Sequence, residues 1–415
     1  MKYTIYLIFL LVSIVCTGQT NNPTFNQIYT LIMQKNFFHA KTLYDNKHTS
    51  LSNAQQNYLA ALLDNAFNKV SLSEQRIANL KGDFSDSLWF ELYKVKEDNA
   101  VKAFDYKTAK ATAQTMLQQY KYLLSPDGQE DLTNSLHMWT ALEHTPPQRV
   151  VIHGTNRLKM KKDKAGLNNL VAIAGKDTAD FIFDTGANMS TISLSTAKRL
   201  HLQIIPADIE VGAITGATVR AQLGVCKQFK LGNIEINNAV FLVLADSALA
   251  FPQISYKIEG ILGYPVICAL KEVQLTQDGY LVIPENETAI HTEPNMAIDR
   301  LSPLIFIDGK HYTFDTGADE TFLYHNFYEA NKEEIAANYK PVHIRFGGAG
   351  GKRELEAYKI KHHFNIMEKD VVLDSVPVLK EKINNELVYG NIGQDIIRQF
   401  KSMTINFDKM FIKFD

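Results

Sequence analysis

Cysteine is scarce in this sequence of 415 residues, which contains three, at positions 16, 226 and 268. There is no CxxC pair and no HExxH segment, so the common zinc-binding spacings and the thioredoxin-type redox motif are absent. Cys16 lies in an N-terminal apolar run, which leaves Cys226 and Cys268 for the rest of the chain. These two could form a disulfide in an oxidising compartment, but their spacing does not require one. We therefore expect neither a disulfide framework nor a metal or organic cofactor.

The sequence also lacks an excess of charge of either sign. Lys and Arg number 43 and Asp and Glu number 45, which gives a formal net charge of −2. Such a balance produces no broad positive field that would attract a polyanion. A nucleic-acid partner or an anionic membrane surface is therefore not expected.

The N-terminal apolar run extends from Ile5 to Val15, after a single Lys. It is shorter than the ~20 residues of a membrane span but fits the apolar part of a signal peptide. We predict a signal peptide over residues 1–18, cleaved after Gly18, a secreted or periplasmic protein, and no membrane segment after cleavage. Lipid attachment at Cys16 is the less favoured alternative, because Val15 stands where lipoprotein sites usually have a small residue.

Residues 22–145 have few glycines and carry apolar residues at three- and four-residue steps, as in "NYLAALLDNAFNKV". This period is typical of helices. Phe37 and Ala40 recur in kind as Tyr106 and Ala109, 69 residues later, which is near twice the ~34-residue period of helix-turn-helix repeats. The pattern fits a tetratricopeptide-like repeat domain, and a plain helical bundle fits it equally well.

After Pro146-Pro147 the pattern changes to short β-branched and aromatic runs separated by Gly, Asn and Asp, which predicts a mostly β region. This region contains a duplication. "FDTGA" begins at Phe183 and again at Phe314, and each Asp is followed by a Gly 32 residues later. "GILGYPVI" and "GNIGQDII" come at nearly the same distance after each Asp, followed by "VQLTQDGYLVI" and "MTINFDKMFIK". We therefore expect two similar lobes, at 148–290 and 300–415.

Asp184 and Asp315 each end an apolar strand, where a carboxyl group lies beside a low-dielectric core. If the two lobes pack about a pseudo-twofold axis, the two aspartates meet at that axis. Two neighbouring carboxyl groups share one proton, so one can act as a general base on a water molecule while the other acts as a general acid. The simpler interpretation is a pair of structural strand-end turns that were duplicated and have lost activity.

The segments "DTGADET", "GILG" and "GNIG" resemble the retropepsin-like aspartic proteases, the retroviral and bacterial relatives of pepsin. The resemblance covers about residues 150–415, and Ala after each DTG fits the retroviral branch. It implies an all-β bilobal aspartic protease fold of two pseudo-symmetric lobes, preceded here by the α-helical domain. Retroviral members build the site from two identical chains, whereas this chain supplies both halves and is expected to be a monomer.

The resemblance also implies roles for individual residues. Asp184 and Asp315 would be the catalytic pair. Thr185, Gly186, Thr316 and Gly317 would form the supporting loops, in which the threonines lock the loops together. The substrate-binding residues would be Ala187, Asn188, Ala318 and Asp319 beside the pair and Ile214, Thr215, Gly216, Gly347 and Gly348 in two flap hairpins. Tyr264 and Gln394 follow the late glycines, where retroviral members carry an Arg that ties the lobe down.

The expected function is that of an exported aspartic endopeptidase acting on extended peptides. The alternative is a non-catalytic peptide-binding protein whose helical domain recruits partners. The helical domain could also regulate access to the cleft or be a propeptide, and the sequence leaves these roles open.

Overall fold

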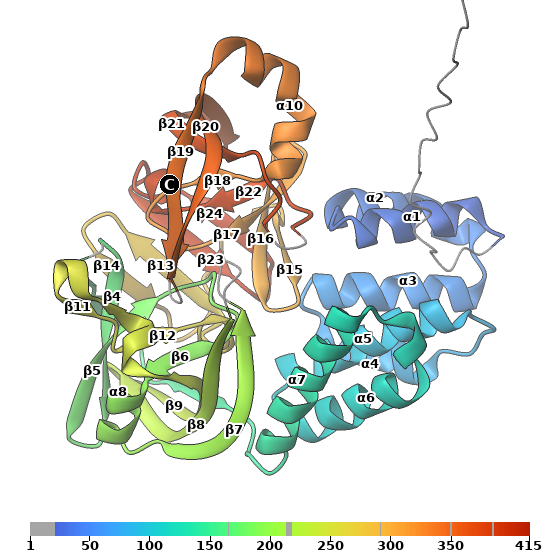
Figure 1. Ribbon diagram of the computed structural model, residues 1–415. Coiled ribbons are helices and arrows are strands. Elements are labelled where there is room, and N and C mark those ends of the chain that lie inside the picture. The colour runs from blue at the N-terminus through green and yellow to red at the C-terminus, as the bar shows by residue number, and fades with distance from the viewer. Residues whose placement is uncertain (1–20, 165, 213–217, 291, 349–350, 384–385) are drawn as a thin grey trace, which may run out of the picture.

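The computed structural model describes residues 21–415 except 165, 213–217, 291, 349–350 and 384–385 (Figure 1). The predicted signal peptide and Cys16 lie outside the described residues. A helical region comes first and a large β-rich region follows it, which confirms this order as predicted from the sequence. Cys226 and Cys268 are both free thiols.

The helical region contains seven α-helices and two short 3-10 turns. The helices are α1 (Pro23–Met33), α2 (Phe37–Lys47), α3 (Asn53–Ala66), α4 (Val70–Asn79), α5 (Asp86–Lys102), α6 (Tyr106–Gln119) and α7 (Pro126–Leu142), and the turns are η1 (His48–Ser50) and η2 (Lys121–Leu123). Among the described residues, no helix is both long enough and apolar enough to cross a membrane.

The turns within the pairs α1–α2, α3–α4 and α5–α6 are alike. Each has one residue with positive φ, at Lys35, Asn68 and Phe104, which are 33 and 36 residues apart. In all three, the N–H of this residue bonds to the carbonyl three residues earlier, and the next N–H bonds five residues back. This hydrogen-bond pattern is a common way to end a helix. The helical region therefore uses one turn geometry three times.

The β region contains two large sheets, a smaller sheet between them and a two-stranded ribbon of β10 (Ala250–Phe251) and β11 (Tyr256–Lys257). The first large sheet consists of β1 (Arg149–Ile152), β3 (Lys161–Lys162), β4 (Asn168–Ala174), β5 (Asp177–Phe183), β6 (Ser190–Ser193), β7 (Gln203–Gly212), β8 (Thr218–Leu231), β9 (Ile234–Leu244) and β12 (Gly260–Leu262). The second consists of β15 (Met296–Asp299), β16 (Ser302–Ile307), β17 (Lys310–Phe314), β18 (Phe322–Leu323), β19 (Pro341–Gly348), β20 (Gly351–Ile366), β21 (Lys369–Leu379) and β22 (Gly390–Ile392).

The two large sheets follow the same path. The first contains the order β4-β5-β12-β6-β9-β8-β7 and the second the order β16-β17-β22-β18-β21-β20-β19. In each, the DTG-bearing strand pairs in parallel with the strand of the late glycine, namely β5 with β12 and β17 with β22. Helices also recur at matching places, with α8 (Leu194–Arg199) and α10 (His325–Asn338) after β6 and β18, and α9 (Tyr264–Ala269) and α11 (Gln394–Ile397) after β12 and β22.

The smaller sheet joins the two halves. Its order is β2 (Asn156–Lys159), β14 (Tyr280–Ile283), β13 (Glu272–Thr276), β23 (Ser402–Asn406) and β24 (Phe411–Phe414). The similar closing segments noticed in the sequence form the hairpins β13–β14 and β23–β24, and β13 pairs with β23, with Val273 opposite Ile405. The pairing of these hairpins couples the first β half to the second.

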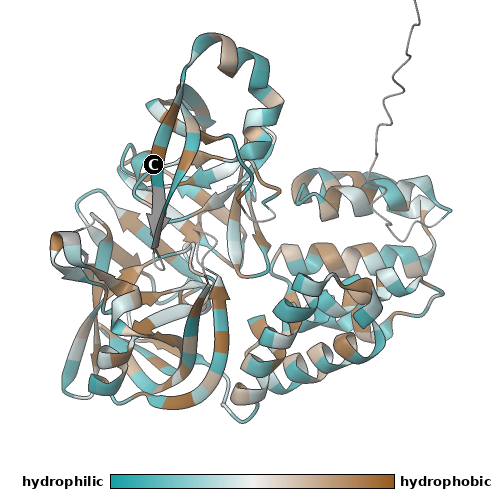
Figure 2. Cartoon of the chain, viewed as in Figure 1, coloured by the Kyte–Doolittle hydropathy of each residue, from teal (hydrophilic) through white to brown (hydrophobic). Residues whose placement is uncertain are grey.

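The helical region packs against both halves of the β region. Residues of α1–α3 share a buried apolar cluster with β15, β16, β18, β20 and β21, and residues of α5–α7 share another with β5, β7–β9 and β12. Figure 2 shows hydrophobic and hydrophilic residues alternating along the long strands of the β region, as expected when one face of a strand is buried. The helices therefore complete the hydrophobic core on one side of the sheets.

Candidate active site

Asp184 and Asp315 come directly after the ends of β5 and β17. Their backbone N–H groups bond to the carbonyls of Leu262, 3.1 Å away, and Ile392, 3.0 Å away, in the parallel neighbour strands. The preceding Phe183 and Phe314 are fully buried. Each aspartate is thus held where an apolar strand leaves the core.

The two DTG turns face each other. A Cβ atom built on Gly186 would lie 2.5 Å from Cγ of Asp315, and one built on Gly317 would collide in the same way with the carboxyl group of Asp184. Each carboxyl group therefore packs against the glycine of the other turn, although the two turns are 131 residues apart in the chain. Only glycine leaves room for this approach.

The threonines of the two turns are joined by four hydrogen bonds. Thr185 N–H donates to Thr316 Oγ1 at 3.1 Å, and Thr316 N–H donates to Thr185 Oγ1 at 3.0 Å. Each hydroxyl also donates to a carbonyl of the opposite strand, to Phe314 at 2.7 Å and to Phe183 at 2.8 Å. Both threonines have no exposed surface, so these bonds are shielded from water and hold the turns in one geometry.

The carboxyl oxygens accept backbone N–H groups of their own turns. Asp184 Oδ1 accepts from Gly186 at 2.9 Å and Ala187 at 3.1 Å. Asp315 Oδ1 accepts from Gly317 at 2.8 Å, and its Oδ2 accepts from Asn391 Nδ2 at 3.3 Å. The partners of the two carboxyl groups therefore differ.

Burial raises the pKa of Asp184 well above its ordinary value, and the negative charge of Asp315 raises it further. Burial also raises the pKa of Asp315, while hydrogen bonds from Asp184, Gly317 and Asn391 oppose that shift. Two carboxyl groups in such a setting do not both ionise readily, so the pair retains one proton to a higher pH than an exposed aspartate would. Chemically, the pair can offer a base and an acid side by side.

The predicted substrate-binding residues beside the pair are engaged in different contacts. Asn188 and Asp319 are both exposed. Asn188 Oδ1 accepts a hydrogen bond from Ser302 Oγ at 2.8 Å, and Asp319 forms an ion pair with Arg398. The carbonyls of Ala187 and Ala318 accept N–H groups of Tyr264 at 2.8 Å and Gln394 at 2.9 Å.

The structure describes some of the residues predicted to form the flaps. Ile214, Thr215 and Gly216 lie outside the described residues. Gly347 and Gly348 lie at the end of β19, opposite Lys352 and Gly351 of β20, so they belong to a β-hairpin. Both predicted flap positions in the second half therefore lie in paired β-strand.

In the second half, residues after the late glycine contact the DTG turn and the residues that follow it. The Gln394 side chain donates to the carbonyl of Thr316 at 2.8 Å, and Arg398, one helical turn further on, contacts Asp319. Thr321 adds a bond from its hydroxyl to Asp395 at 2.6 Å.

Asn391 and Thr313 are not among the predicted site residues, yet Asn391 donates a hydrogen bond to Asp315 and Thr313 donates one to Asn391. A signal for them is visible in the sequence, because "GNIG" carries Asn where "GILG" carries Ile, and "YTFD" carries Thr where "FIFD" carries Ile.

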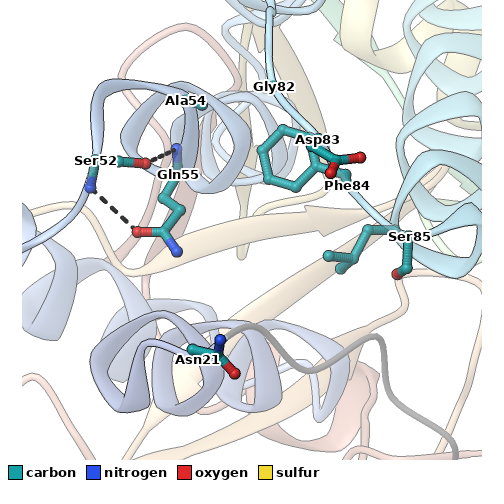
Figure 3. A pocket seen from close by; sticks show the side chains of 9 residues that line it. Asn21, Ser52, Ala54, Gln55, Gly82, Asp83, Phe84 and Ser85 are labelled. Atoms are coloured by element: carbon teal, nitrogen blue, oxygen red, sulfur yellow. Dashed lines mark hydrogen bonds between the residues drawn. The ribbon is translucent and has the colours of Figure 1, made fainter.

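A hollow of about 350 Å³ lies away from the aspartates, near the N-terminal ends of α3 and α5 (Figure 3). The side chain of Ser52 accepts the N–H of Gln55 at 3.3 Å, and the side chain of Gln55 accepts the N–H of Ser52 at 3.1 Å. These bonds form a capping box that satisfies the start of α3. Two of the residues that line the hollow, Ser52 and Gln55, are therefore engaged in helix capping.

Residues 170–266 match the family model described as aspartyl protease. The matched segment runs from β4 into α9 and includes Asp184, and it supports an aspartyl protease relationship. No curated protein matches the sequence.

Two solved structures are similar to part of the chain, namely basic 7S globulin from soybean and conglutin gamma, a basic 7S globulin from lupine seeds. Each has 10% sequence identity and a TM-score of 0.40 and covers 63% of this chain, with 94% of the soybean chain and 95% of the lupine chain covered.

Proposed function

We propose that this protein is a single-chain, two-lobed aspartic endopeptidase of retropepsin-like fold, in which Asp184 and Asp315 activate one water molecule. The observation that carries the proposal is the packing of each aspartate carboxyl group against the glycine of the other DTG turn. The matching strand orders of the two large sheets support the two-lobed arrangement, and the aspartyl protease match supports the reaction class.

In the proposed reaction the ionised aspartate takes a proton from the water, whose oxygen attacks the carbonyl carbon of the peptide bond. The protonated aspartate gives its proton to the carbonyl oxygen, which forms a neutral tetrahedral diol. Collapse of the diol breaks the C–N bond, returns one hydroxyl proton to a carboxylate and delivers the other aspartate's proton to the leaving nitrogen. No covalent intermediate and no metal ion take part.

The threonine contacts would contribute by holding the two turns at a fixed separation. Catalytic groups act effectively only when the surrounding structure holds them within a fraction of an ångström of the productive geometry. Buried, mutual hydrogen bonds between Thr185 and Thr316 provide this support at the base of the pair.

The experiment is digestion of a peptide library by the full chain without residues 1–18, at several pH values, with cleavage detected by mass spectrometry as new N-termini. We expect cleavage on the acid side of neutral and its loss in Asp184→Asn and Asp315→Asn. Asp370→Asn is the matched control. Asp370 is an exposed aspartate of β21 that forms an ion pair with His363.

Saturable peptide binding without new N-termini would contradict the proposal and favour the non-catalytic peptide-binding alternative. Full turnover in either Asp→Asn variant would also contradict it, because the mechanism needs both carboxyl groups.

We further propose export through a signal peptide over residues 1–18, and action as a monomer, since one chain supplies both aspartates. N-terminal sequencing of the protein recovered outside the cytoplasm would test the cleavage after Gly18, and sedimentation would test the monomer. The three similar helical turns, 33 and 36 residues apart, support the proposal that the helical region is a tetratricopeptide-like repeat.

A further inference from the structure

The two aspartates have different neighbours in the strands that hold them. In the first half, Ile182 of β5 is paired with Ile261 of β12, and both side chains are buried. In the second half, the same register pairs Thr313 of β17 with Asn391 of β22. One aspartate thus follows an apolar pair of residues, and the other follows a polar pair.

The polar pair is oriented toward Asp315. Thr313 Oγ1 donates to Asn391 Oδ1 at 2.5 Å, so the amide oxygen of Asn391 already has its donor. The amide nitrogen is then directed at Asp315 Oδ2, 3.3 Å away. The opposite orientation of the amide would place its oxygen against an ionised carboxylate, which is unfavourable because both would be acceptors.

The site of this contact is shielded from water, since Asn391 has 4% of its surface exposed. A hydrogen bond to a charged group is stronger in such a setting than in water and favours the charged form of its acceptor. Asp184 has no equivalent side-chain donor at the matching position, because Ile261 has no polar side-chain atom.

We propose that Asn391 is a positioning residue that keeps Asp315 ionised as the general base, so that Asp184 carries the shared proton and acts as the general acid. This assignment rests on the proposed function. It is supported by the hydrogen bond that Asn391 donates to Asp315, which opposes the rise that burial causes in the pKa of Asp315, and by the absence of a side-chain donor at the matching position Ile261 beside Asp184.

Other titratable groups near the pair do not reverse this assignment. Tyr324 contacts Thr313, and burial raises its pKa above its ordinary value, so it stays neutral. Glu386 acts on Tyr324, and burial raises the pKa of Glu386 as well.

The test replaces the polar pair by apolar side chains of similar shape, as Asn391→Leu and Thr313→Val. The readout is kcat/KM against pH for the best-cleaved peptide of the library. We expect the acid limb of the profile to move to higher pH, by about one unit for Asn391→Leu and by less for Thr313→Val, because a charge-assisted bond to the base is lost or loosened. Thr404→Val, a buried threonine of β23 outside the site, is the control, with an unchanged limb.

An unchanged acid limb in folded Asn391→Leu would overturn the inference, since a purely structural role lowers activity without moving the limb. If Asn391→Leu does not fold, Thr313→Val decides by the same criterion.

A second measurement does not depend on activity. In the full chain with carbon-13-labelled aspartate carboxyl groups, assigned with Asp184→Asn and Asp315→Asn, we expect Asp315 to ionise at lower pH than Asp184. Thr313→Val or Asn391→Leu should move the Asp315 titration upward. The reverse order of ionisation would overturn the inference. If the wild-type chain cleaves no peptide, the proposed function fails, and the titration still decides which aspartate Asn391 holds ionised.

Discussion

The first and second halves of the β region share a strand order and a DTG turn but differ directly behind the aspartate. In both halves the glycine N–H of the DTG turn donates to the aspartate carboxyl group, and equivalent threonine bonds hold the turns. They differ in the residue pairs Ile182–Ile261 and Thr313–Asn391. The comparison indicates that both halves retain the backbone and threonine contacts that bring the two carboxyl groups together. One polar side chain, that of Asn391, then gives the two carboxyl groups different hydrogen-bond partners.

The largest expected effect comes from removing either acidic group. Asp184→Asn and Asp315→Asn should each lower kcat roughly 100- to 10,000-fold, because each removes one partner of the acid–base pair. Their double variant should be little worse than either single variant, since the pair acts as one unit. Initial rates of peptide cleavage measure this. A single variant with near-normal kcat would show that the two halves do not share the chemistry.

The next effect concerns the glycines that separate the carboxyl groups. Gly186→Ala and Gly317→Ala each place a Cβ into the carboxyl group of the other half. We expect each to destabilise the fold by about 1–3 kcal/mol through overpacking and to lower activity at least about tenfold. Urea unfolding and kcat measure the two effects. Similar losses of stability and kcat in both variants would support the equivalence of the two turns. An alanine that is tolerated in one half would contradict it.

Replacement of the threonines should have a smaller effect, which is mainly on the stability of the fold. Thr185→Val or Thr316→Val leaves a buried carbonyl and a buried N–H in the opposite turn without their partners. Each should lower the free energy of unfolding by about 1–3 kcal/mol. The double variant should cost less than the sum of the two single variants, because the four bonds hold the same two turns together and the loss of two of them already loosens the other two. Thr404→Val serves as the control for a buried threonine outside the turns. Strict additivity would show that the two turns are independent.

A pH experiment distinguishes the two aspartates without measuring cleavage. Because burial raises the folded-state pKa of Asp184 above its unfolded value, the folded protein binds this proton more tightly than the unfolded chain. The contribution to stability is therefore complete at acid pH and is lost as pH rises from the unfolded pKa through the folded pKa. Asp184→Asn should be more stable than the wild type at neutral pH. Asp315→Asn should gain less, because the hydrogen bond from Asn391 stabilises the ionised form of Asp315. Thermal unfolding at pH 4 and 7 checks this, and an equal gain in both variants would contradict the asymmetry.

The smallest effect concerns how the helical region contacts each half. Lys35 forms an ion pair with Asp299 of the second half at 2.6 Å. The Asn134 side chain exchanges two hydrogen bonds with the backbone of Glu210 in the first half, at 2.7 and 2.8 Å. Lys35→Ala should change stability by less than about 1 kcal/mol, because the pair is partly exposed, and Asn134→Ala by about 1 kcal/mol. If either variant changes kcat/KM, the helical region regulates the site, and unchanged kinetics would argue against that role.

Much of this arrangement could be predicted from local features of the sequence. The helical region follows from its three- and four-residue apolar period, and the β region from its short β-branched runs. The repeat of "FDTGA" and of a glycine motif about 78 residues later indicates a duplicated unit, because such spacing survives in the linear chain. The roles of Asn188 and Asp319 and of the flap residues stay predictions.

Asn391 is a site residue that local features of the sequence do not reveal. In the sequence it is one Asn in a "GNIG" segment, 76 residues from Asp315, and it resembles a neutral substitution for Ile. Its importance arises from the parallel pairing of β22 with β17, which sets Asn391 opposite Thr313 and turns its amide toward the carboxyl group. Comparison of the two copies could have pointed to it, but the direction of the amide depends on the donor from Thr313.

The sequence by itself determined the spacing of apolar residues that distinguishes the helical from the β region, the duplication and the identity of the two acidic residues. These properties depend on the order of residues along the chain. Only the tertiary structure decided that each carboxyl group meets the glycine of the other turn, that the closing hairpins form one sheet and that the helices cover both halves. These contacts join residues that are far apart in the chain, and they depend on how buried surfaces and hydrogen-bonding groups match across the fold. Residue spacing alone does not encode that match.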